Sequence, residues 1–125
     1  MKLLAALLFA FAVGIAPAQG YGASKVKPEV AKKQLQLLQT NYAASKKALA
    51  KSPKDAKLKK KFVAAGVKFG HESMMSQVLD RKIKYKQALT VYREVLKVDP
   101  NNAVAKQESA LIINIYKSLG RPIPN

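Results

Sequence analysis

The chain has no cysteine, no tryptophan, one histidine and only seven acidic residues among 125. Without cysteine, disulfides, thiol nucleophiles and thiolate metal sites are excluded. His71 alone cannot form a site with several histidine ligands, and no Gly-x-Ser-x-Gly turn surrounds Ser73, Ser76 or any other serine. The acids are scattered singly, and no phosphate-binding glycine loop is present. We therefore expect no enzyme, no cofactor and no metal site.

The first 18 residues are typical of an export signal. Lys2 gives a short positive start, residues 3–13 are almost entirely Leu, Ala and Phe, and Ala16-Pro17-Ala18 fits the small-x-small cleavage rule. A retained membrane helix is the alternative, but the apolar run is shorter than the roughly 20 residues that a span needs. We expect cleavage after Ala18, a periplasmic or secreted protein with no stable membrane span, and a flexible lead-in over residues 19–27.

Basic residues far outnumber acidic ones, with 23 Lys and Arg against seven Asp and Glu and a net charge of +16. Such a charge attracts polyanions, among them nucleic acid, anionic lipid headgroups and acidic cell-wall polymers. Twenty of the 23 basic residues are lysine, which favours diffuse attraction over bidentate phosphate recognition. A well-solvated surface without a polyanion partner is the other interpretation of this charge.

Apolar residues recur at helical spacing from residue 28 onward, and no segment shows the alternation typical of strands. A first helix is predicted from Pro28 to near Ala50, with Ser52 as the N-cap of the second. Gly66 and Gly70 lie within the second helix, where glycine costs about 1 kcal/mol relative to alanine. We expect close approach of a neighbouring helix to compensate; the alternative is that these glycines weaken or end the helix.

The remaining segments predict a loop and two more helices. Residues 72–84 either continue the second helix or fold back as an apolar loop, and we favour a short extension, then a loop ending near Asp80, a candidate N-cap. The third helix should stop at Asp99-Pro100, because proline cannot continue it. One of Asn101-Asn102 should cap a fourth helix, which Gly120 ends. The fold is thus predicted to be all-α, with one helical domain over residues 28–125.

Two spaced patterns carry a family resemblance: Phe62-x2-Ala65-Gly66-x2-Phe69 and Tyr85-x2-Ala88-x3-Tyr92-x7-Pro100. Together they resemble one tetratricopeptide repeat (TPR) unit with an insertion of roughly 10 residues between its two helices. The first and fourth helices resemble halves of a preceding and a following repeat. The resemblance implies an antiparallel stack of about four helices and a binding scaffold without chemistry of its own. A single complete repeat favours a compact stack over a long superhelical groove, with a homodimer as a further possibility.

TPR ligands lie on the concave face, which the first helix of each repeat lines. The resemblance therefore implies eight candidate partner-binding residues: Lys60, Val63, Val67, His71, Val104, Gln107, Leu111 and Asn114. Ordinary surface and packing roles are the alternative for these residues. Some TPR domains grip a peptide's C-terminal carboxylate with Lys, Asn and Arg, but only Lys60 fits that set, and valines occupy two of its polar positions. We expect an exported scaffold for a protein or peptide partner, with a Lys-rich polyanion-binding protein as the alternative.

Overall fold

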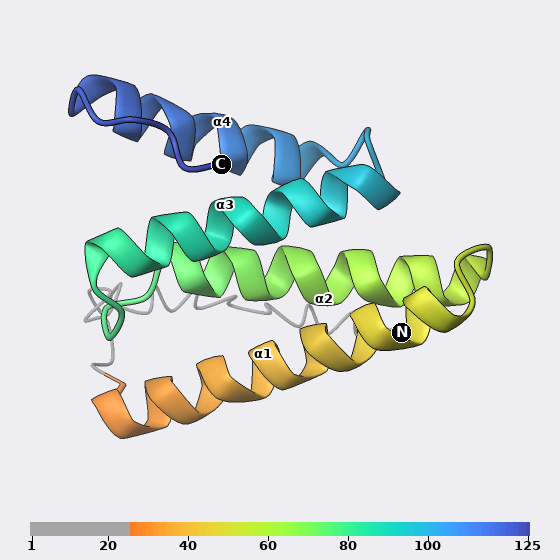
Figure 1. Cartoon of the computed structure of the whole chain (residues 1–125). Coiled ribbons are helices and arrows are strands. Elements are labelled where there is room, and N and C mark those ends of the chain that lie inside the picture. Colours follow the sequence, from red (N-terminus) through yellow and green to blue (C-terminus); the bar gives the residue numbers. More distant parts are fainter. Residues whose placement is uncertain (1–25) are drawn as a thin grey trace, which may run out of the picture.

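The computed structural model describes residues 26–125 as a stack of four α-helices, with no strand in that range. They are α1 (Pro28–Lys51), α2 (Ala56–Met74), α3 (Arg81–Val98) and α4 (Ala103–Ser118). Successive helices run antiparallel, and each lies beside the one before it (Figure 1). The predicted all-α, four-helix fold is confirmed. The predicted export signal and most of the predicted lead-in fall on residues 1–25, outside the described part.

The start of α2 differs from the prediction. Asp55, not Ser52, is its N-cap: the Asp55 carboxylate accepts hydrogen bonds from the Lys57 and Leu58 backbone N–H groups at 2.9 and 3.1 Å. The prediction of Ser52 was wrong because the N–H of Ser52 still bonds to carbonyls of α1, and residues 52–54 form the turn. Aspartate caps a helix as well as serine does, so the helix begins at the next available acceptor.

The other helix ends agree with the sequence-based expectations. α2 runs on to Met74, a loop follows, and Asp80 caps α3 by accepting from Lys82 N–H at 2.8 Å. α3 stops before Asp99-Pro100, and Asn102 caps α4 by accepting from Ala105 N–H at 2.9 Å. Gly120 follows α4 with a φ of 62°, the left-handed conformation that glycine adopts without steric cost.

The core lies mainly between α2 and α3, which approach closely at two glycines. A Cβ atom on Gly66 would overlap Cγ2 of Val95, and one on Gly70 would lie 2.7 Å from Cε1 of Tyr92. Val95 and Tyr92 are both fully buried. The glycines therefore do not break α2, which continues past both of them; they provide the close contact that the sequence led us to expect.

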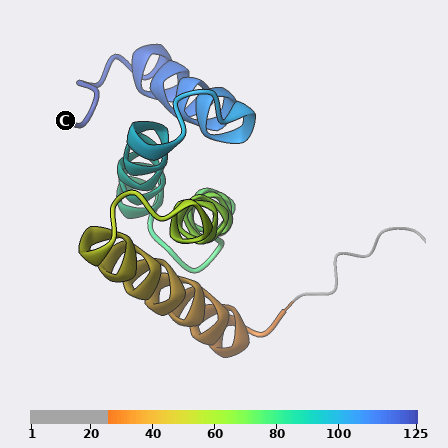
Figure 2. The same cartoon turned by 90° about the vertical axis from the view of Figure 1, so that its right-hand side faces the viewer.

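The outer helices cover this core from its two sides. α1 packs mainly against α2, reaches α3 through the ion pair of Lys46 with Glu94 at 3.6 Å, and buries none of its residues completely. Its Tyr42 ring lies 5.5 Å from the Phe62 ring and 5.6 Å from the Phe69 ring, measured between centroids. α4 packs chiefly against α3 through Ala105, Ser109 and Ile112 (Figure 2). Within residues 26–125, no helix combines the length and apolarity needed to cross a membrane.

Tyr42 gives the fold an alkaline sensitivity that can be measured. Burial raises the pKa of its phenol to about 12, and the charge of Glu94 adds to the rise. The folded state thus holds this proton more tightly than the unfolded chain, whose tyrosine pKa is about 10. The contribution of Tyr42 to stability is complete below pH 10 and is lost as the pH rises to about 12.

Tyr42→Phe is therefore expected to flatten the fall in melting temperature between pH 10 and about 12. Thermal melts at closely spaced pH values, with the wild type alongside, measure the difference. Lysine deprotonation falls in the same range but affects both proteins alike. Parallel curves for Tyr42→Phe and the wild type would contradict the prediction.

Candidate binding groove

A hollow of about 620 Å³ opens between α2, the α3–α4 turn and the start of α4. α2 and the start of α4 lie on the same side of α3 (Figure 2), and residues of both line the hollow. We call it the groove. Its lining residues are Lys59, Lys60, Val63, Ala64, Val67, Lys68, His71, Val98, Asp99, Asn102 and Val104.

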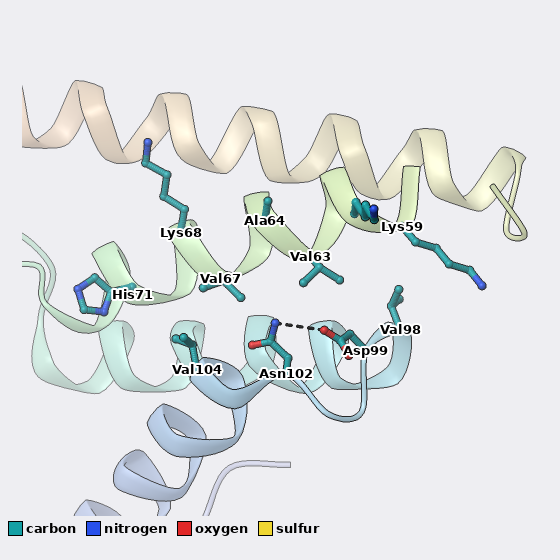
Figure 3. A pocket seen from close by; sticks show the side chains of 11 residues that line it. Lys59, Val63, Ala64, Val67, Lys68, His71, Val98, Asp99, Asn102 and Val104 are labelled. Carbon is teal, nitrogen blue, oxygen red and sulfur yellow. Dashed lines mark hydrogen bonds between the residues drawn. The ribbon is translucent and has the colours of Figure 1, made fainter. Parts of the chain in front are cut away.

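The floor of the groove is apolar. Val63 and Val67 are one helical turn apart on α2, so they share a face. Val67 points toward Val104 of α4, and Val63 points toward Asn102 and Asp99 of the turn (Figure 3). Val63 and Val67 are half-buried and pack against the core on their inner side. Val104 and Ala64 are exposed. The floor is thus anchored by the core yet remains open to solvent, where it can receive an apolar side chain.

The turn after α3 forms the opposite wall and fixes where α4 begins. Asn102 has two roles: its Oδ1 caps α4, and its Nδ2 donates to Asp99 Oδ2 at 3.3 Å (Figure 3). Val104 follows two residues later, so this cap fixes its place in the lining of the groove. The proline that ends α3 and the asparagine that starts α4 together define this wall.

The rim on the α2 side is basic. Lys59, Lys60 and Lys68 line the groove and are exposed, and none of them forms an ion pair with any residue from 26 to 125. Asp99 is the one acidic residue of the lining, and it already accepts from Asn102. The lining therefore carries more positive than negative charge, beside a floor of valines.

A polar cluster at the far end of the groove ties three helices together. Glu108 of α4 is bonded to His71 of α2 (Nδ1 to Oε1, 2.7 Å) and accepts from the hydroxyl of Tyr92 of α3. Burial raises the pKa of the Tyr92 phenol above its usual range, and the bond to Glu108 and its charge add to the rise. The cluster stabilises the position of α4 relative to α2. No group of three or more His, Asp or Glu able to hold a metal occurs among the described residues.

The groove contains part of the predicted set. Lys60, Val63, Val67, His71 and Val104 line it, whereas Gln107, Leu111 and Asn114 lie exposed farther along α4 and do not. The reason is the direction of α4, which leaves α2 after its start (Figure 2).

Sequence reasoning missed six lining residues. Ala64 and Lys68 continue the i, i+4 series from Lys60, so helical periodicity alone could have found them. Lys59 precedes Val63 by four residues on α2 and carries the same signal. Val98, Asp99 and Asn102 gave no such signal, because only the packing of the turn against α2 brings them to the groove. Compared with known proteins, the chain matches no family model, no curated protein and no solved structure. What the groove can bind is therefore inferred from its own residues.

Proposed function

We propose that this protein is an exported TPR-type scaffold that binds a protein or peptide segment in the groove, in the cell envelope or outside the cell. The observation that carries the proposal is the open valine floor formed by Val63, Val67 and Val104 under a polar rim. The volume of the groove, about 620 Å³, lies within the range of roughly 300–1,000 Å³ typical of ligand sites. Covering such a floor with an apolar side chain removes apolar surface from water, which favours binding.

Two further features support the assignment. The small and aromatic residues of the TPR-like pattern lie at the α2–α3 contact, where Ala88 and Tyr92 are fully buried and Gly66 admits Val95. The groove opens on the side of α2 and α4, the helices that correspond to the first helix of each repeat. Export is supported by the signal-like composition of residues 1–18.

A peptide screen tests the proposal directly. Random peptides displayed on phage are selected on the protein, and the enriched peptides are synthesised and titrated while the valine methyl signals are followed by NMR. We expect the methyl groups of Val63, Val67 and Val104 to shift. Ala64→Trp, which fills the groove from an exposed position, should weaken binding by about ten-fold or more, ~1.4 kcal/mol.

Ala43→Trp is the matched control, because Ala43 is equally exposed but lies on α1 outside the groove. It should bind the selected peptides like the wild type. Selected peptides that bind Ala64→Trp with wild-type affinity, or that leave the three valine signals unchanged, would rule out the groove as the binding site.

The exposed lysines of α2 favour polyanion binding as a second candidate function. Lys57 and Lys61 are exposed on α2 but do not line the groove. Reversing both to Glu should therefore spare a groove-bound peptide yet weaken a polyanion that covers the whole basic face. Polyanion affinity would also fall steeply with salt, whereas burial of an apolar side chain responds weakly. Single-stranded DNA titrated at several salt concentrations measures this second candidate.

A further inference from the structure

We infer that the groove selects an extended partner segment in which two acidic residues flank an apolar one, in the order acid-x-apolar-x-acid. The inference rests on the proposed function and specifies the partner of that same site. It follows from three observations: the lysines of the rim, which form no ion pair within residues 26–125, their spacing along α2, and the valines that lie beside them.

The first observation is the charge of the groove. Lys60 and Lys68 are exposed lining residues without an ion pair in the described part of the chain. A partner carboxylate placed beside each would complement this charge, and complementary charge gives specificity by disfavouring partners of like charge. Lysine suits this role because its flexible stem carries a single point charge that can follow the ligand.

The second observation is the distance between these lysines. They are eight residues apart on α2, which corresponds to roughly 12 Å at a helical rise of 1.5 Å per residue. An extended chain advances about 3.3 Å per residue, so two acids four residues apart span about the same length. Side chains alternate in an extended chain, so its first, third and fifth residues point the same way. The acids and the residue midway between them thus all face α2.

The third observation is what lies between the lysines. Val63, Ala64 and Val67 lie between Lys60 and Lys68 along α2. Figure 3 shows Ala64 and Lys68 on the α1 side of α2 and the two valines on the side of α4, so the middle residue of the segment reaches across Ala64 to the valines and the flexible stem of Lys68 must turn toward the segment. Leucine or a similar side chain fits there. The opposite wall carries Asp99, which would repel a carboxylate, so the acids of the partner must lie on the α2 side. This places the whole recognition face of the segment toward α2.

An extended strand of five residues is narrower than a helix, which with its side chains is about 10–12 Å wide. It can place its central side chain on the valines while its backbone stays at the open side of the groove.

Five designed peptides, blocked at both ends and flanked by Gly-Ser repeats, test the inference on the full chain. The predicted ligand carries Glu-Ser-Leu-Ser-Glu. Two others replace both Glu residues by Gln or by Lys, a fourth replaces Leu by Ser, and the fifth, Glu-Leu-Ser-Ser-Glu, has the same composition with Leu on the opposite face. We expect the first to bind about ten-fold more tightly than each of the others.

Variants of the protein locate the contact. Lys60→Gln and Lys68→Gln should each weaken binding of the predicted ligand several-fold, and both are surface changes on an intact helix. Lys47→Gln removes an equally exposed lysine from α1 and should leave the affinity unchanged.

The remaining outcomes separate this inference from the proposed function. Equal binding of the Glu and Gln peptides, or no binding of any designed peptide while phage-selected peptides still occupy the groove, would overturn the inference alone. Equally tight binding of all three peptides that carry two Glu residues, whether Leu is present, absent or moved, with a steep salt dependence, would also overturn it and would favour the polyanion-binding candidate. If neither designed nor selected peptides bind, both ideas fail.

Discussion

Replacing Gly66 by leucine is expected to destabilise the protein by about 3 kcal/mol, because the new side chain would occupy space that α3 already fills. Even a Cβ atom there overlaps Cγ2 of Val95, and the Tyr42 ring lies 3.4 Å away on the α1 side. Val95 is fully buried and has no room to move aside. The side chain must therefore separate α2 from α3, which share the most extensive contact in the fold.

Thermal and denaturant melts followed by circular dichroism measure the effect. A loss of about 3 kcal/mol lowers the melting temperature of a domain of this size by roughly 15 °C. Leucine is a better helix former than glycine by nearly 1 kcal/mol, and this gain offsets only part of the loss. Ala64→Leu is the matched control: it places the same side chain two residues earlier on the exposed side of α2 and should melt like the wild type. Equal melting of the two variants would show that α2 and α3 do not meet at Gly66.

Local chemistry made most helix ends predictable. Asp80 and Asn102 supply the oxygen acceptors that the first N–H groups of α3 and α4 need, and proline at position 100 closes α3. The prediction of Ser52 as the N-cap of α2 was wrong because two residues could cap this helix. The choice between Ser52 and Asp55 depends on how the turn leaves α1. Propensity alone cannot decide between two good caps.

The groove was less predictable than the fold. Helical periodicity groups Lys60, Val63 and Val67 on one face of α2, and the sequence is sufficient for that. The sequence does not give the angle at which α4 leaves α2. Leu111, a candidate partner-binding residue by analogy with TPR units, therefore lies outside the groove with half of its surface exposed. The bond between His71 and Glu108 joins residues 37 positions apart and has no local signal in the sequence.

The position of α4 decides whether the groove has a second wall, and the buried side chain of Ile112 holds α4 in that position. Ile112 is fully buried in the core cluster and is the largest side chain that α4 buries in this way. Ile112→Ala is expected to cost about 2–5 kcal/mol, because it removes buried methyl groups and leaves a cavity. α4 is the last helix and contacts mainly α3, so the loss should fall on α4 first.

Hydrogen exchange resolves this loss helix by helix. In Ile112→Ala, the amides of α4 should lose protection while those of α2 and α3 keep most of theirs, and binding of the groove peptide should weaken because Val104 and Glu108 leave with α4. Leu111→Ala is the matched control, since Leu111 is exposed on the same helix, and it should stay within about 0.5 kcal/mol of the wild type. If α2 and α3 lost protection together with α4, the four helices would unfold as one cooperative unit. The groove would then be a rigid feature of the whole stack, and its second wall could not open without global unfolding.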